Sequence, residues 1–202
     1  PYTTLFRSVK MAFYRKLDNF SQMQVISGVS CLKDANFTVD ETNDNDIGCV
    51  VGTNEGGLGS TYDFETLIAA EGNAKGSAFK FPNTVYNAAG GYLSINTGIK
   101  GYGVTLTSGP NSGIHSIGYA MNVIKDGQEK AMLATGNDDN TAIIENLYNE
   151  LGMVSKTVVA PYSESDGFVL GDSSASMLLE DEEYAKARGA KIYAHALGCG
   201  HG

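Results

Sequence analysis

The stretch at residues 105–113, TLTSGPNSG, decides the fold of this chain. It enters a tight turn from a short strand pattern, and an apolar-periodic segment, IHSIGYAMNVIKDG, follows at once. This order predicts a strand over 104–108 and a helix over 111–125. Such a strand–helix elbow commonly presents a nucleophile at its tip. Here the tip is Pro110, which has no nucleophilic group, so the pattern raises the question of what the elbow does.

Buried strands and amphipathic helices alternate on both sides of the elbow. Further strands are expected at 47–52, 130–135, 173–179 and 191–197, and helices at 16–35, 62–70, 83–97, 141–151 and 182–188. The paired glycines Gly90 and Gly91 weaken the helix at 83–97 and suggest that another segment packs very close there. The alternation predicts an α/β domain built on a layered sheet.

Composition and charge narrow the class of protein. The chain has 202 residues with 42% hydrophobic content, and no apolar run approaches the roughly 20 residues of a membrane helix. A formal net charge of −9 argues against nucleic acid or an anionic membrane as partner. Cys31, Cys49 and Cys199 are odd in number and widely spaced, so neither a disulfide framework nor a metal site is expected. A cytoplasmic location follows.

Two local motifs have simple interpretations. The glycine run at 52–59, GTNEGGLG, fits neither dinucleotide nor phosphate-loop spacing, and no lysine follows it. It therefore indicates a tight connection from a strand to a helix. His115 lies one turn into the helix after the elbow and is expected to be packed or hydrogen-bonded rather than catalytic.

The two ends of the chain look artificial. The first eight residues, PYTTLFRS, match one translated frame of a common sequencing-library adapter. Residues 1–10 are therefore treated as an adapter-derived segment and 11–202 as the natural domain. The last residues stop where an apolar pattern gives way to a glycine loop, so we expect a domain that is truncated at both ends.

Five sequence segments, taken in their order along the chain, point to one family. They are RKLDNFSQ, VVGTNEGGLGS, FPNTVYNAAGGYLSI, GIKGYGVTLTSGPNSGIHSIGYAMNVIKDG and DGFVLGDSSASMLLEDEEYAKARGAKIYA. Together they resemble the N-terminal half of a β-ketoacyl synthase, over about 15–200. The resemblance implies the thiolase-like fold, an α/β architecture with α/β/α/β/α layers, of which this chain would form one half. It also implies a dimer across an edge strand, here 104–108.

The resemblance makes the elbow unusual. In the family the turn reads Thr-Ala-Cys-x-Ser-Gly, and aligning Ser112 and Gly113 with its end puts Pro110 at the place of the acylated cysteine. Proline supplies neither a thiol nor a backbone N–H, and the cysteine's N–H forms part of the family's oxyanion hole. The chain's own cysteines lie elsewhere. The two catalytic histidines of the family belong to its C-terminal half, and His195 and His201 do not match them.

The resemblance also implies sites and partners. The elbow residues expected to line or cap a remnant pocket are Ser108, Gly109, Pro110, Asn111 and Ser112. The residues expected at the dimer interface or acyl tunnel are Phe81, Pro82, Asn83, Val104 and Leu106. No intact catalytic residue, cofactor or metal is expected.

Three functions follow from this reading. The first is a subunit that resembles a chain-length factor of fatty-acid or polyketide synthesis, paired as a homo- or heterodimer with an active ketosynthase and served by acyl carrier protein. A second is an active 3-oxoacyl-[acyl-carrier-protein] synthase, acyltransferase or decarboxylase variant. A third is an inert structural relic. Whether the chain is an enzyme stays open at this point.

Overall fold

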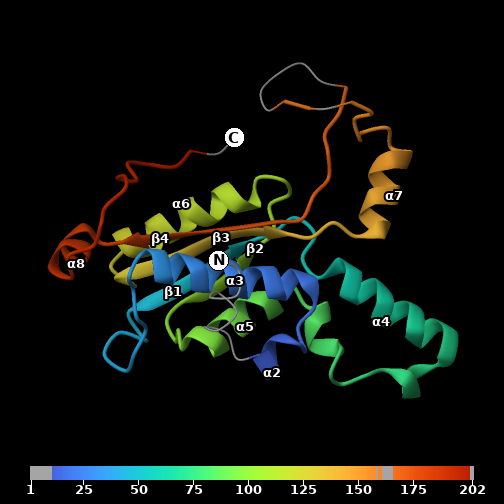
Figure 1. Cartoon of the computed structure of the whole chain (residues 1–202), viewed down its shortest axis with the longest axis horizontal. Helices are drawn as coiled ribbons and strands as arrows, with labels where there is room; N and C mark the ends of the chain where they lie inside the picture. Colours follow the sequence, from blue (N-terminus) through green and yellow to red (C-terminus); the bar gives the residue numbers. More distant parts are fainter. Residues whose placement is uncertain (1–10, 158, 161–165, 201–202) are drawn as a thin grey trace.

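A computed structural model describes residues 11–157, 159–160 and 166–200. The segment 1–10, expected to be artificial, lies outside these residues, as does His201. The described chain forms a four-stranded sheet in the order β2-β1-β3-β4 (Figure 1). Strand β1 (Ile47–Gly52) pairs in parallel with β2 (Gly103–Leu106) and with β3 (Ala131–Asp138). Strand β4 (Ser173–Glu180) pairs antiparallel with β3.

Central strand β1 owes its position to its composition. All six of its residues are buried, as expected for a parallel strand that is covered on both faces. Its side chains alternate between two cores, with Ile47 and Cys49 in one and Val50 in the other. The predicted bounds of this strand are confirmed.

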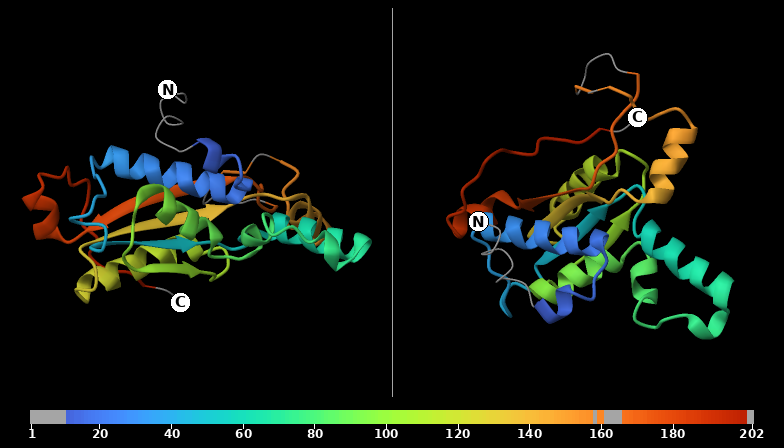
Figure 2. Two further views of the ribbon diagram at one scale, coloured as in Figure 1. Left: turned by 90° about the horizontal axis from the view of Figure 1, so that it is seen from below. Right: turned by 45° about the vertical axis from the view of Figure 1, so that its right-hand side comes forward.

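Helices cover both faces of the sheet (Figures 1 and 2). Helices α3 (Asn19–Asp34) and α5 (Ala88–Thr97) share one core with β1 and β3, through Leu32 and Leu93. Helix α6 (Ser112–Lys125) packs on the opposite face through Ala120 and Val123. The architecture is thus the α/β fold expected from the sequence.

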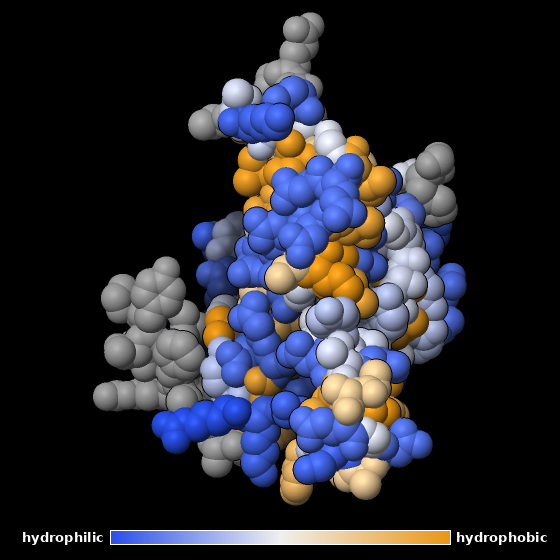
Figure 3. Space-filling view, turned by 90° about the vertical axis from the view of Figure 1, so that its right-hand side faces the viewer, coloured by the Kyte–Doolittle hydropathy of each residue, from blue (hydrophilic) through white to orange (hydrophobic). Residues whose placement is uncertain are grey.

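The other helices lie at the periphery. They are α2 (Met11–Tyr14), α4 (Leu58–Glu71), the 3₁₀ turns η1 (Asn73–Lys75) and η2 (Phe81–Thr84), α7 (Ala142–Glu150) and α8 (Glu182–Ala187). Helix α4 projects from the body of the molecule (Figure 2), and none of its residues is buried. The face that carries α4 and α7 shows apolar surface between hydrophilic regions (Figure 3). On and after α7, this surface includes Leu147, Leu151 and Met153, which are 49%, 60% and 44% exposed.

The helix predicted over 83–97 begins later than expected. Residues 81–84 form the 3₁₀ turn η2, and Val85 then adopts an extended conformation with φ −104° and ψ 140°. The α-helix therefore starts only at Ala88. The expectation of close packing at its paired glycines is also wrong for Gly91, because a Cβ there would meet no atom within 4 Å. At Gly90, a Cβ would make only an ordinary contact, 3.4 Å from Val51 Cγ2.

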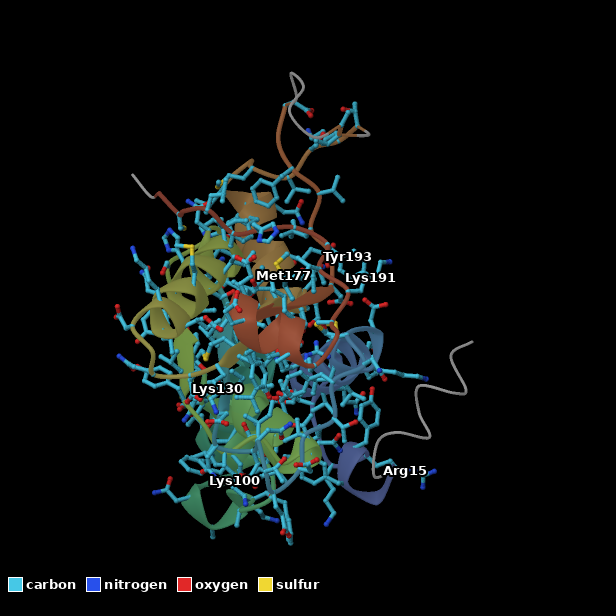
Figure 4. All side chains as sticks on the ribbon, turned by 90° about the vertical axis from the view of Figure 1, so that its left-hand side faces the viewer. Arg15, Lys100, Lys130, Met177, Lys191 and Tyr193 are labelled. Atoms are coloured by element: carbon cyan, nitrogen blue, oxygen red, sulfur yellow. The ribbon has the colours of Figure 1, made fainter. Side chains whose placement is uncertain are left out.

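The strand predicted at 191–197 does not form. This segment has no strand hydrogen bonds in the structure, and Leu197 is 95% exposed. An alternating apolar pattern becomes a strand only when a neighbouring backbone pairs with it. Figure 4 shows Lys191 and Tyr193 of this segment on the same side of the molecule as Met177 of β4. Among the described strands, β4 therefore remains an edge, and its side chains are alternately exposed and half-buried along most of its length, with only Leu179 buried.

Candidate functional site

The elbow connects the edge strand β2 to helix α6. Strand β2 ends at Leu106 and α6 begins at Ser112, as predicted to within two residues. Between them, Gly109 has φ +71°, a left-handed conformation that glycine adopts without the steric cost of a side chain. Pro110 and Asn111 form the tip, where both are exposed, and Ser108 is exposed beside them.

Ser112 holds the elbow together from inside. Its Oγ donates a hydrogen bond to the Gly109 carbonyl at 2.6 Å and accepts one from the Ser108 N–H at 2.8 Å. The residue is 1% exposed. Because its hydroxyl proton is already donated and solvent does not reach it, Ser112 acts as a structural residue and is a poor candidate for a nucleophile. Of the five expected elbow residues, only Ser112 is buried.

Three glycines bring the elbow down onto the sheet. A Cβ at Gly52, the last residue of β1, would collide with the backbone carbonyl of Ser112. A Cβ at Gly113 would lie 3.3 Å from the Cα of Gly136 in β3. The first turn of α6 therefore lies against the carboxyl ends of two parallel strands, the edge where α/β sheets commonly bind ligands.

Asp138 fixes the neighbouring connection, a role that the sequence did not reveal. One of its oxygens accepts hydrogen bonds from Thr53 Oγ1 at 2.6 Å, from the Asn54 N–H at 2.9 Å and from the Glu55 N–H at 3.0 Å. This carboxylate at the end of β3 thereby orders the glycine-rich connection between β1 and α4. That connection is the tight strand-to-helix turn predicted from its spacing. The only sequence signal was an acidic residue shortly after the buried strand predicted at 130–135.

The chemistry available at the elbow is limited. Pro110 has no N–H to donate, and the N–H groups of Ser108 and Ser112 bond to Ser112 Oγ and to the Gly109 carbonyl. These two N–H groups are therefore committed within the turn. Neither of them is free to stabilise an oxyanion.

None of the three cysteines replaces the missing thiol at the tip. Burial raises the pKa of Cys31 to about 11, so its thiol stays protonated at neutral pH. Burial also raises the pKa of Cys49, which lies inside β1, with Sγ 3.8 Å from Ser94 Oγ. Cys199 is exposed and contacts α6 at Gly118. The expected separation of the cysteines from the turn agrees with these positions.

The residues expected at an interface divide into two groups. Val104 and Leu106 of β2 pack inward against the core under α6. Asn83 is also buried, and its Oδ1 accepts a hydrogen bond from Tyr92 OH at 2.8 Å. Phe81, 55% exposed, and Pro82 present their side chains to solvent, whereas Val104 and Leu106 are half-buried. The place of these residues at an interface stays a prediction.

A groove follows the edge of β2 that has no partner strand among the described residues. Its volume is about 480 Å³, and it opens between α5 and β2. The residues that line it are Cys49, Tyr86, Asn87, Gly90, Gly91, Ser94, Gly103, Val104 and Thr105. An unpaired strand edge beside a groove can accept another chain. Sequence reasoning had named Val104 alone of these residues as part of a contact surface.

Metal and membrane features are also limited. Among the described residues, no three His, Cys, Asp or Glu side chains gather closely enough to hold a metal ion. Within the same residues, no helix is both long and apolar enough to cross a bilayer. His115 is half-buried on α6, in agreement with the expected packed position.

Comparisons with known proteins agree with this geometry. Residues 3–185 match the family model described as "Beta-ketoacyl synthase, N-terminal domain". The chain is 34% identical over 201 residues to 3-oxoacyl-[acyl-carrier-protein] synthase 2 of Vibrio cholerae, covering 92% of this chain and 47% of that protein. It is 31% identical to the protein of the same name from Synechocystis, covering 91% and 46%. The chain thus spans about half the length of these curated relatives.

Solved structures show the same fold. A β-ketoacyl synthase from Burkholderia phymatum superposes with a TM-score of 0.79 at 26% identity, covering 88% of this chain and 46% of that one. The ishigamide ketosynthase/chain length factor gives a TM-score of 0.79 at 23% identity, covering 91% and 46%. The thiolase-like fold expected from the sequence is therefore confirmed, and the chain belongs to the β-ketoacyl synthase family, of which it represents the N-terminal domain.

Proposed function

We propose that this chain belongs to a ketosynthase-family subunit of fatty-acid or polyketide synthesis that does not acylate itself and acts as a chain-length-factor-like partner. The observation that carries the proposal is Pro110 at the exposed tip of the elbow. The tip has the position of a nucleophile in the family, and proline cannot act as one.

The loss affects two parts of the reaction. Acyl transfer needs a thiolate or an equivalent nucleophile to accept the acyl group, and Pro110 provides none. It also needs hydrogen-bond donors for the oxyanion, and removing a single such donor typically lowers the rate about 10²- to 10³-fold. A serine at this position would lack the thiol but keep the backbone N–H as an oxyanion donor. Pro110 lacks both groups. The N–H groups of Ser108 and Ser112 are occupied within the turn.

A partner surface is available at the edge of the sheet. Strand β2 has a neighbour on only one side in the described sheet, and the groove beside it is lined by Tyr86 and Gly91. Apolar side chains near it are exposed, including Val85 at 41% and Phe81 at 55%. We therefore assign this edge, with η2 and the start of α5, to contact with a ketosynthase subunit.

Solved relatives of the same fold include a ketosynthase in complex with its chain length factor and a ketosynthase bound to its acyl carrier protein. Acyl carrier protein and a ketosynthase are the partners that we propose.

An active 3-oxoacyl-[acyl-carrier-protein] synthase is the second candidate. The observation that favours it is the name of the curated relatives, which are synthases at 34% and 31% identity. Such an activity would need a nucleophile other than the residue at position 110, or a decarboxylation that needs no acyl-enzyme. The two candidates differ in whether this subunit carries a covalent acyl group.

Co-purification tests the proposed partnership. The complete protein, co-expressed with a ketosynthase that retains its cysteine, should form a stable complex whose product length differs from that of the ketosynthase alone. Gly91→Leu should abolish the complex without unfolding the chain, because a Cβ at Gly91 meets open space in the groove. Gly171→Leu is the matched control, since its Cβ also meets open space but lies just before β4, which forms the opposite edge of the sheet. Failure to bind any ketosynthase, or equal effects of the two variants, would refute this assignment.

A further inference from the structure

A row of polar side chains lies between helix α3 and strands β3 and β4. Gln24, Thr135 and Asn137 are buried in it, whereas Ser27, Ser174 and Ser176 are half-buried. At one end of the row, three hydroxyl groups form hydrogen bonds with one another. Ser176 Oγ lies 2.7 Å from Ser27 Oγ and 2.9 Å from Thr135 Oγ1. Thr135 and Ser176 are direct partners in the antiparallel pair, so both face α3.

The next pair along the strands is only partly satisfied. Asn137 pairs with Ser174, on the same face as Thr135 and Ser176. Asn137 Nδ2 donates to the Phe20 carbonyl at 3.0 Å. Because Ser27 and Phe20 bond to successive rows of the sheet, α3 runs antiparallel to β3. Gln24, which lies between Phe20 and Ser27 on the same helix face, is therefore placed over the gap between these rows.

The polar atoms around this gap lack partners. Among the described residues, Ser21 Oγ, both amide atoms of Gln24, Asn137 Oδ1 and Ser174 Oγ form no hydrogen bond. Ser21 and Gln24 are fully buried, and Asn137 is 2% exposed. An unpaired buried polar group costs about 1–3 kcal/mol, and native proteins contain few of them. Asn137 and Ser174 are cross-strand partners, and Gln24 lies on the face of α3 that covers them, so we infer that a guest binds between these side chains.

Negative charge surrounds the open end of the row. Asp139 follows directly after β3, and its Oδ1 is buried without a partner among the described residues. Asp18, Asp138 and Asp172 act electrostatically on it. Within the described part of the chain, the ion pairs formed by Lys, Arg and His involve none of these four carboxylates. The amino end of α3 carries the positive end of the helix dipole, which disfavours a cation nearby. The N-cap residue Asp18 places a negative carboxylate at this end, where it accepts the Ser21 N–H at 3.0 Å.

We propose that this gap binds one alkali-metal cation, held by Ser21 Oγ, Gln24 Oε1, Asn137 Oδ1 and Ser174 Oγ, with Asp139 supplying the charge at its entrance. Neutral hydroxyl and amide oxygens can replace the hydration shell of a monovalent ion, as carbonyl oxygens do in potassium filters. Zinc prefers nitrogen and sulfur ligands, whereas magnesium and calcium sites usually contain carboxylates in direct contact. The set of oxygens therefore favours potassium or sodium. This inference does not depend on the proposed function.

The test compares chloride salts at equal ionic strength. The thermal midpoint of the complete protein should rise by about 5 °C or more between choline chloride and saturating potassium or sodium chloride. Gln24→Leu and Asn137→Leu should each remove this shift, because each deletes one oxygen ligand. Ser27→Ala is the matched control, since it alters the satisfied end of the row and should keep the shift.

Two results would overturn the proposal. An equal midpoint in all three salts would mean that water, or no guest, fills the gap. A shift that persists in both leucine variants would place the ion elsewhere. If a leucine variant fails to fold, anomalous scattering from rubidium in crystals of the wild-type protein decides: a peak at Asn137 Oδ1 supports the site, and its absence there refutes it.

Discussion

Removing the Ser112 hydroxyl should loosen the elbow measurably. In Ser112→Ala, the Ser108 N–H and the Gly109 carbonyl each lose a partner that the structure places at 2.8 and 2.6 Å. A buried hydrogen bond contributes about 1 kcal/mol net, and stranding its partners adds to the loss. We therefore expect a cost of about 2 kcal/mol. The shape of the side chain otherwise changes little, so no cavity term of importance enters.

Amide hydrogen exchange measures this loss of stability at the elbow itself. A loss of about 2 kcal/mol corresponds to roughly 30-fold faster exchange at the first turn of α6, if the elbow opens independently of the rest. Peptides that span 108–116 in the complete protein, analysed by mass spectrometry, provide the measurement. Peptides from β1 serve as an internal reference, because this strand is fully buried.

Ser108→Ala is the matched control for this prediction. Ser108 is exposed, and it contributes its backbone N–H to the turn, which alanine retains. Its effect should stay within about 0.5 kcal/mol. If Ser112→Ala leaves exchange unchanged, or if the two alanine variants behave alike, the structural role assigned to Ser112 is wrong.

Three further predictions concern stability and exposed surface. Gly52→Ala should destabilise the protein by about 1–3 kcal/mol, because its Cβ would collide with Ser112. Gly91→Ala should stabilise the isolated subunit by about 0.5–1 kcal/mol, because its Cβ meets no atom and alanine favours the helix. Urea unfolding measures both changes, and a change of the same sign in both variants would contradict the packing. Burial, followed by the charges of Asp18 and Asp172, raises the pKa of Asp139 to about 6, above its unfolded value. Stability should therefore fall as pH rises from about 4 to 6 in buffers without alkali metal, and Asp139→Asn should remove this step. Finally, the 202-residue chain alone should bind hydrophobic dyes through its exposed apolar surface; a cooperative monomer that binds no dye would count against this expectation.

Apolar periodicity and turn residues predicted strand β1 and the strand, turn and helix of the elbow. The continuous apolar run of β1 gave its bounds, and the sequence around the elbow gave the order of strand, turn and helix. The segment 191–197 misled because its apolar pattern does not say whether a backbone partner is present. A strand needs that partner as much as it needs the pattern.

Contacts between distant residues were beyond sequence reasoning. Asp138 bonds to Asn54, 84 positions away, and Asn137 bonds to Phe20, 117 positions away. Both contacts depend on how α3 and the β1–α4 connection are placed against the end of β3. A single sequence contains no signal for that placement, so neither the clamp at Asp138 nor the polar row could be predicted from it.

The absence of self-acylation is the central claim, and intact-protein mass spectrometry tests it most directly. The complete protein is incubated with an acyl-carrier-protein thioester, beside a ketosynthase that retains its cysteine and beside Pro110→Cys, which returns the thiol and the backbone N–H. We expect an acyl adduct on the active ketosynthase, partial acylation of Pro110→Cys, and no mass increase on the wild-type chain. A covalent acyl group on the wild-type chain, mapped between residues 105 and 116, would contradict the account and favour the active synthase.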